Sequence, residues 1–235
     1  MREPEGSTTI PYFFYKTIHR TRSEKGNLGS AGIFTFGARL AGKLPASFDY
    51  GIETAGQTGD VASDPLHAWA GHWLLGYTAG SLKTTPRFLV EYNYASGDRS
   101  TSDGKRGTFD QLYPTNHYKY GAIDLLGWRN LRSMRAGSEM KVRPRLTVSL
   151  SYLSHWLAQA SDAFYNGSGA PVFRLPPGAS GRHVGHEFDL VFLGALSKQY
   201  SLGLGYARLW AGSFLKQAAG GSDFSYPYAF LAYNF

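Results

Sequence analysis

Ten stretches of this 235-residue chain alternate apolar and polar side chains, and each is bounded by Gly, Pro, Asn, Asp or Ser. Successive side chains of a β-strand point to opposite faces, so the alternation predicts ten strands with one apolar and one polar face. The stretches cover 10–20, 31–42, 46–56, 66–78, 86–97, 130–142, 145–159, 185–196, 200–214 and 225–235. Their lengths suit tilted membrane strands of about 9 to 11 residues with short extensions.

The links between these stretches alternate in length along the chain. Short links are predicted near 43–45, 79–85, 143–144 and 197–199. Longer links are predicted near 21–30, 57–65, 98–129, 160–183 and 216–223. Short periplasmic turns and longer extracellular loops produce this alternation in an antiparallel membrane barrel, whereas a soluble sandwich has no reason to keep it.

The apolar and polar faces are well separated in most strands. Phe88, Val90 and Tyr92 share one face of the fifth stretch, and Arg87 and Glu91 lie on the other. A soluble barrel would produce the same alternation, but Tyr and Trp sit near strand ends on the apolar face, as in the aromatic girdles of membrane proteins. The facing of the first, fourth and ninth stretches stays open.

Composition narrows the class of protein further. Aromatic residues make up 15% of the chain, charged residues only 17%, and there are 29 Gly and no Cys. The sequence contains no apolar run near 18 residues, which excludes a transmembrane helix. The net charge of +7 comes from Lys and Arg residues scattered singly along the strands, so nucleic acid is not an expected partner.

Charged side chains on the polar faces would line the lumen of such a barrel. The predicted lining residues are Arg39, Arg87, Glu91, Arg135, Glu139, Lys141, Glu187 and Asp189. Rings of Arg and Lys select anions in a confined pore, and interspersed carboxylates weaken binding so that a polymer can leave. The alternative is that these residues pair across strands and simply fill a wet interior.

The sequence shows no catalytic, metal or cofactor motif. His183 and His186 are three residues apart, so a strand would point them to opposite faces and not toward one ion. The glycine-containing stretches near 166–169 and 178–181 are not followed by a helix, so they are not phosphate-binding loops.

The last ten residues, 226–235, resemble the C-terminal strand of bacterial outer-membrane β-barrels. Tyr233 and Phe235 share one face of this strand, and Phe235 is the final residue. The resemblance implies that this ending is the insertion signal read by the barrel-assembly machinery.

A longer motif resembles the alginate export family of outer-membrane proteins. Residues 107–130 read GTFDQLYPTNHYKYGAIDLLGWRN and follow the strand end NYASGD at 93–98. The resemblance is strongest over 86–235 and includes the strand start GHEFD at 185–189. The motif carries Asp110, Asn116, His117, Asp124, Arg129 and Asn130, which the resemblance places at the extracellular rim, with loop ordering favoured over substrate contact.

The resemblance implies a porin-like barrel, embedded in outer-membrane lipid, that exports an anionic polysaccharide. Family barrels have eighteen strands and this chain offers about ten, so residues 1–235 are expected to be the C-terminal portion of such a domain. The leading hypothesis is therefore a non-enzymatic, anion-selective channel without a cofactor, for a polysaccharide or a small anionic solute.

Two alternatives come from other classes of protein. A closed ten-strand barrel has the size of the omptin proteases, and Asp110, His117, Asp124 and His155 could supply catalytic groups at the rim. A non-conducting surface or adhesion barrel would instead have a lumen plugged by side chains.

Overall fold

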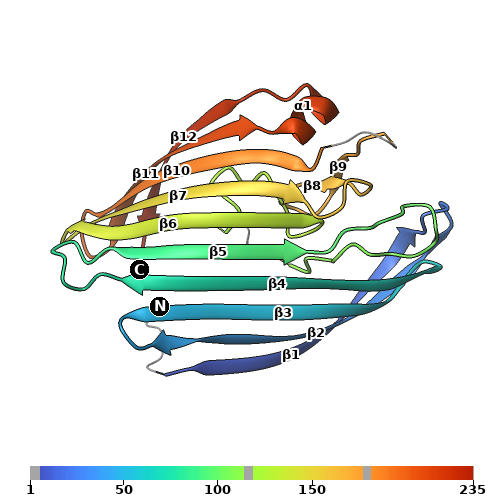
Figure 1. The fold of residues 1–235 in the computed structure, drawn as a ribbon, viewed down its shortest axis with the longest axis horizontal. Coiled ribbons are helices and arrows are strands. Elements are labelled where there is room, and N and C mark those ends of the chain that lie inside the picture. The colour runs from blue at the N-terminus through green and yellow to red at the C-terminus, as the bar shows by residue number, and fades with distance from the viewer. Residues whose placement is uncertain (1–5, 114–118, 177–180, 235) are drawn as a thin grey trace.

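A computed structural model describes residues 6–113, 119–176 and 181–234 of the chain. The main feature is a ten-stranded antiparallel sheet with the strand order β1-β2-β3-β4-β5-β6-β7-β10-β11-β12 (Figure 1). The strands are β1 (Thr8–Arg22), β2 (Leu28–Leu44), β3 (Phe48–Val61), β4 (Asp64–Thr78), β5 (Arg87–Ala95), β6 (Leu131–Arg143), β7 (Leu146–Leu157), β10 (His183–Ala195), β11 (Tyr200–Ala211) and β12 (Phe224–Tyr233). Each strand pairs with its neighbours along this order, so the ten predicted strands are confirmed.

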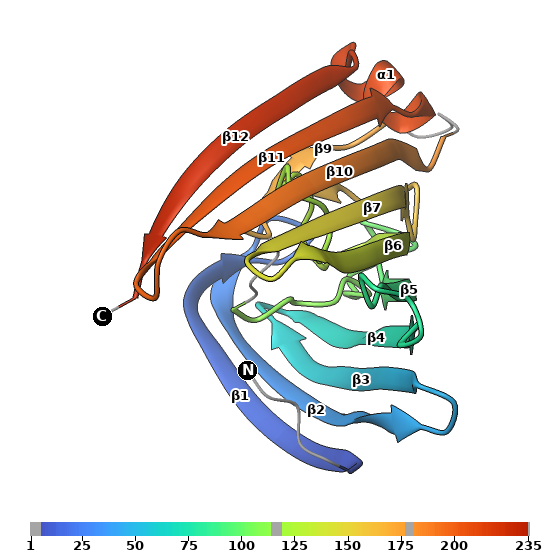
Figure 2. The ribbon, with the colours of Figure 1, turned by 90° about the vertical axis from the view of Figure 1, so that its left-hand side faces the viewer.

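The sheet curls into an open arc, with β1 and β12 at its two edges (Figure 2). Within the described residues, no ladder joins β1 to β12. The all-β antiparallel fold is thus confirmed, and the sheet has a concave face, a convex face and two strand edges without a neighbour. No helix in the described part of the chain is long and apolar enough to cross a membrane.

The predicted strict alternation of short and long links is wrong. The predicted long link at 57–65 is a turn of only Ala62 and Ser63, because β3 continues to Val61 and β4 begins at Asp64. The Gly59 backbone has a φ of 142°, and a side chain there would overlap the carbonyl oxygen of Gly32. Only glycine tolerates this geometry, so polar, glycine-containing residues continue the strand where a loop was predicted.

The three longest links gather at one end of the strands, here called the loop end. Residues 96–130, 158–182 and 212–223 connect strands there, together with the shorter links 23–27 and 62–63. Two of these links contain small elements: β8 (Phe164–Tyr165) pairs with β9 (Pro171–Phe173), and α1 (Ser213–Ala219) follows β11. The predicted ninth strand was expected to reach residue 214, but it ends at Ala211. The helix begins after Gly212, and Phe214 packs into the core.

The three strands whose facing stayed open now have a defined orientation. In β1, Tyr12 and Lys16 face the concave side, where they contact Glu53 and Asp110, while Phe13 packs with Phe34 and Phe36 on the convex side. In β4, His72 faces the concave side and Trp73 the convex side. In β11, Arg208 lies on the convex face near the loop end, where it donates to Ser225.

Two apolar clusters lie on the concave face, and both include the link 96–130, here called the long loop. One cluster joins the loop residues Tyr120 and Leu126 to β6, β7, β10, β11 and α1. The other places Phe109 of the loop, which is 2% exposed, against small and branched residues of β2 to β5. Trp128 packs against both clusters. The long loop therefore turns inward and covers much of the concave face.

Candidate functional site

Side chains of two distant strands hold the long loop on the concave face. Gln57 of β3 pairs with the loop backbone: its Nε2 donates to the Asp110 carbonyl at 2.8 Å, and its Oε1 accepts from the Asp110 N–H at 2.7 Å. On β10, Glu187 accepts from the Ile123 N–H at 3.0 Å, and Asp189 accepts from the Ala122 N–H at 3.2 Å. Glu187 and Asp189, predicted to line the pore, therefore lie buried beneath the loop.

Residues of the family-like motif tie the long loop to the neighbouring 158–182 loop. The buried Asn130 side chain donates to the carbonyls of Gln159 and Ala163 at 2.9 and 3.0 Å and accepts from the Gln159 N–H at 2.7 Å. Arg129 donates to the Gly169 carbonyl at 3.1 Å and lies over the Tyr165 ring at 4.7 Å. These contacts order the two loops.

Other members of the motif have separate positions. The Asp110 carboxylate accepts from Lys16 of β1 at 2.8 Å, which fixes the loop to the edge strand. Asp124 adopts a left-handed backbone conformation with a φ of 56°. Asn116 and His117 lie outside the described residues.

A buried carboxylate forms the centre of the junction between the two loops. Asp162 accepts hydrogen bonds from the Asp98 N–H, the Thr108 hydroxyl and the Tyr165 hydroxyl, at 2.9, 2.5 and 2.9 Å. Burial, together with the nearby Asp162 charge, raises the pKa of Tyr165 to about 12, so its hydroxyl stays protonated and acts as a donor. These hydrogen bonds join the long loop and the 158–182 loop through one buried carboxylate.

A cavity of about 740 Å³ remains on the concave face between β1 to β3 and the long loop. This size is typical of a small-molecule site. Aromatic and charged side chains line it together: Tyr12, Phe14, Lys16, Arg39, Glu53, Phe109, Tyr113, Lys119, Tyr120 and Trp128. We call it the concave cavity.

The concave cavity combines flat aromatic surfaces with cations. The Tyr12 hydroxyl donates to Glu53 at 2.9 Å, and the Lys119 ammonium lies 5.2 Å from the Trp128 ring. The Trp128 Nε1 atom is buried and has no hydrogen-bond partner in the described part of the chain. Such a wall can stack against the apolar faces of sugar rings and bind carboxylates through its cations.

The predicted lumenal cations divide into paired and unpaired groups. Arg87 forms a two-point ion pair with Asp49, with Nε 2.9 Å from Oδ2. Arg135 donates to Ser151 at 3.1 Å and lies 3.5 Å from Glu91, which also accepts from Asn93. For these two residues the structure shows cross-strand pairing.

Other predicted lining residues are exposed on the sheet. Arg39, Glu139 and Lys141 are exposed, and none of the three forms an ion pair among the described residues. Arg39 lines the concave cavity, whereas Lys141 and Glu139 lie closer to the opposite end of the strands. The structure therefore does not bring all eight predicted residues into one ring.

Among the described residues, no hydrogen bond joins Asp110 to His155, two of the groups considered for hydrolysis, and His117 lies outside those residues. His155 is completely buried, and neither ring nitrogen has a hydrogen-bond partner among the residues described. Asp110 is engaged by Lys16 and by the loop backbone. No cluster of metal-ligating side chains occurs in the described residues.

Sequence reasoning identified Arg39 but missed most of the other residues that build the concave cavity. Tyr12, Lys16 and Trp128 were not singled out, because the first strand is aromatic on both faces and the long loop has no alternation. The available signal was the presence of aromatic residues on both faces of β1. A strand with lipid on one side needs only one aromatic face, so the second face indicated a further apolar contact.

Comparisons with known proteins support the resemblance seen in the motif. A family model described as alginate export matches residues 2–227, nearly the whole chain. A comparison with curated proteins finds no match.

Proposed function

The chain belongs to the alginate export family, and on this basis we propose that its sheet forms part of an outer-membrane channel that exports an anionic polysaccharide. The observation that carries the proposal is the concave cavity, where aromatic rings lie beside Arg39 and Lys119. Neither of these two cations forms an ion pair with another described residue.

The convex face supports a membrane location. Phe36, Val90 and Met134 are 54%, 56% and 57% exposed, and they belong to a wide apolar surface that runs across the strands. A soluble monomer seldom exposes so large an apolar surface, whereas lipid tails match it. Tyr77 and Tyr233 lie at strand ends on the same face, as expected of residues at the membrane interface, whereas Tyr152 and Tyr206 lie in the middle of their strands.

In the working channel, we propose that further strands pair with β1 and β12. An unpaired strand edge in the hydrocarbon region would leave backbone N–H and C=O groups without partners, at a cost of several kcal/mol for each group. Barrel closure removes this cost.

The route for the polymer runs along the part of the concave face that the long loop leaves open. Phe14 and Trp128 offer apolar surfaces to the C–H faces of a sugar ring, and Arg39 offers a fork of donors to its carboxylate. Because Arg87 and Arg135 are neutralised by Asp49 and Glu91, we assign anion preference to Arg39 and Lys119 in the cavity and to Lys141 beyond it.

Ion selectivity in planar bilayers tests the proposal. We expect the full-length protein to conduct, with a reversal potential in a KCl gradient that shows anion preference. Arg39→Gln removes a charge that has no salt-bridge partner among the described residues. We expect the anion-to-cation permeability ratio to fall about two- to fivefold, since one charge a few ångströms away in a wet pore contributes about 1 kcal/mol. Cation preference in the unmodified protein would overturn the proposal.

The ion pair on β3 and β5 supplies the matched control. Asp49→Asn combined with Arg87→Gln removes one negative and one positive charge, so we expect the permeability ratio to stay unchanged. Arg87→Gln alone is not a suitable control, because it would leave Asp49 uncompensated and alter the net charge of the wall.

A non-conducting surface barrel is the second candidate, and the long loop that covers much of the concave face favours it. This candidate predicts no conductance above background in the same bilayers, with the protein fully inserted.

A further inference from the structure

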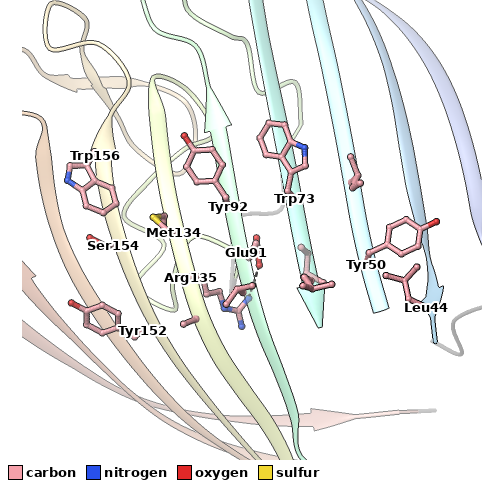
Figure 3. A pocket seen from close by; sticks show the side chains of 15 residues that line it. Leu44, Tyr50, Trp73, Glu91, Tyr92, Met134, Arg135, Tyr152, Ser154 and Trp156 are labelled. Carbon is pink, nitrogen blue, oxygen red and sulfur yellow. Dashed lines mark hydrogen bonds and ion pairs between the residues drawn. The ribbon is translucent and has the colours of Figure 1, made fainter. Parts of the chain in front are cut away.

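The convex face contains a hollow of about 840 Å³ that spans β3 to β7 (Figure 3). Its apolar lining includes Tyr50, Trp73, Tyr92, Met134, Ala136 and Trp156. Trp73 and Tyr92 stack at 5.8 Å between ring centroids and form one wall. Ala136 leaves space between the larger residues around it.

Charged side chains near the hollow belong to the other side of the sheet. Glu91 and Arg135 alternate with the convex residues along β5 and β6, and the dashed line in Figure 3 joins them to each other. Their remaining contacts, with His72 and Ser151, lie on the concave face. The hollow itself is apolar over most of its length.

The loop end of the hollow differs, because one buried polar atom without a described partner lines it and a second belongs to the residue beside it in the ladder. Ser154 lines the hollow and is only 7% exposed, and its hydroxyl has no hydrogen-bond partner in the described part of the chain. His186 lies opposite Ser154 in the pairing of β10 with β7, and its Nδ1 atom is likewise buried without a partner. Unpaired buried polar atoms cost about 1 to 3 kcal/mol each, so a ligand that pairs with them would gain that energy.

A cation lies next to these atoms on the same face. Arg132 is paired with Trp156 in the ladder between β6 and β7, one position beyond Ser154 on that face. Its side chain is exposed and packs over the Tyr94 ring at 5.8 Å. From Ala136 to Arg132, the surface therefore changes from apolar to polar to cationic.

We propose that this hollow is a specific binding site for a membrane lipid with an anionic headgroup. An acyl chain fills the space above Ala136 between the aromatic walls, Ser154 and His186 bond to the polar linkage, and Arg132 pairs with the headgroup phosphate. The inference rests on the membrane location in the proposed function but not on conduction or on the exported substrate.

Native mass spectrometry of the full chain in mild detergent tests the site, with phosphatidylglycerol as the probe and phosphatidylcholine as the comparison lipid. We expect one phosphatidylglycerol to be retained after the other lipids are removed. Arg132→Gln should weaken retention of phosphatidylglycerol about fivefold, which corresponds to roughly 1 kcal/mol for one cation near an anionic lipid.

Filling the hollow supplies the decisive variant. Ala136→Trp should abolish the retained lipid, and Leu150→Trp, on the same convex face but outside the lining, should retain it. Circular dichroism checks that both variants fold. Equal lipid retention by both variants would overturn the proposal. So would the loss of all lipids together, with no single lipid bound more tightly than the rest. Bilayer conductance tests the channel separately.

Ser154→Ala tests whether the Ser154 hydroxyl contacts the bound lipid or is merely buried. We expect the variant to bind phosphatidylglycerol several-fold more weakly and yet to unfold at a higher denaturant concentration in lipid-free detergent, because the unpaired hydroxyl is gone. Unchanged lipid binding would show that the hydroxyl does not contact the lipid and would remove it from the site.

Discussion

The two halves of the concave face carry similar polar residues but expose them differently. On β10, Glu187 and Asp189 are 0% and 5% exposed because the long loop lies over them and bonds to them. Near β1 to β3, Glu53 and Arg39 border the concave cavity. The comparison shows that an inward-facing charge becomes a loop anchor or a lining residue according to what the long loop covers.

The largest expected effect comes from removing the ring that packs the long loop against the half of the concave face near β1 to β3, here called the open half. Phe109→Ala deletes a residue that is 2% exposed, and we expect it to cost about 3 to 5 kcal/mol of unfolding free energy. Conductance should rise, since Phe109 also lines the concave cavity. Denaturant unfolding in micelles and single-channel recording measure the two effects.

Phe164→Ala is the matched variant in the other half of the concave face, here called the sealed half, where the long loop covers β10. This ring is 1% exposed, packs against Phe214 at 6.0 Å and does not line the concave cavity. A comparable loss of stability with unchanged conductance would sharpen the contrast between the halves. If both variants raise conductance equally, the two halves do not act separately.

A smaller effect is expected where the two long loops join. Asn130→Ala removes three hydrogen bonds between the buried side chain and the 158–182 loop, and we expect a loss of about 2 to 3 kcal/mol in unfolding free energy. Asn27→Ala, at an exposed position in another link of the loop end, should change stability by less than about 0.5 kcal/mol. Similar losses in both variants would contradict a structural role for Asn130.

The smallest change in stability is expected for a substitution that moves one aromatic ring. The Tyr12 ring lies directly over Gly37, and a methyl group there would displace the ring and break its bond to Glu53. We expect Gly37→Ala to cost less than about 1 kcal/mol but to weaken the block of current by a short uronic acid oligomer. Gly56→Ala meets open space and should leave the block unchanged.

The sequence was sufficient to locate the strands and most of their faces, because side-chain alternation is a local property. All ten strands were found, and Phe88 and Glu91 lie on opposite faces as predicted. The hairpin at Ala62 and Ser63 was missed, since polar and glycine residues near Gly59 have the composition of a loop. The short helix α1 was missed as well, because Phe214 fits an extended strand equally well.

The candidate site was less predictable, since it depends on contacts between residues far apart in the chain. The pairing of Arg87 with Asp49 crosses from β5 to β3, past the intervening β4, and no local pattern reveals it. The inward path of residues 96–130 is set by Gln57, Glu187 and Asp189, which bind backbone atoms of the loop and not particular side chains. Side-chain alternation could therefore identify the polar face but not the part of it that the long loop leaves open.

The attachment of the long loop at β3 and at β10 also has a mechanical consequence. The described parts of the loop bond to Gln57 on one side of the sheet and to Glu187 and Asp189 on the other. Both attachments lie on the concave face, so flattening of the sheet would draw the two anchor strands apart and strain these hydrogen bonds. The bonds from β3 and β10 to the long loop therefore favour the curved form of the sheet over a flat one.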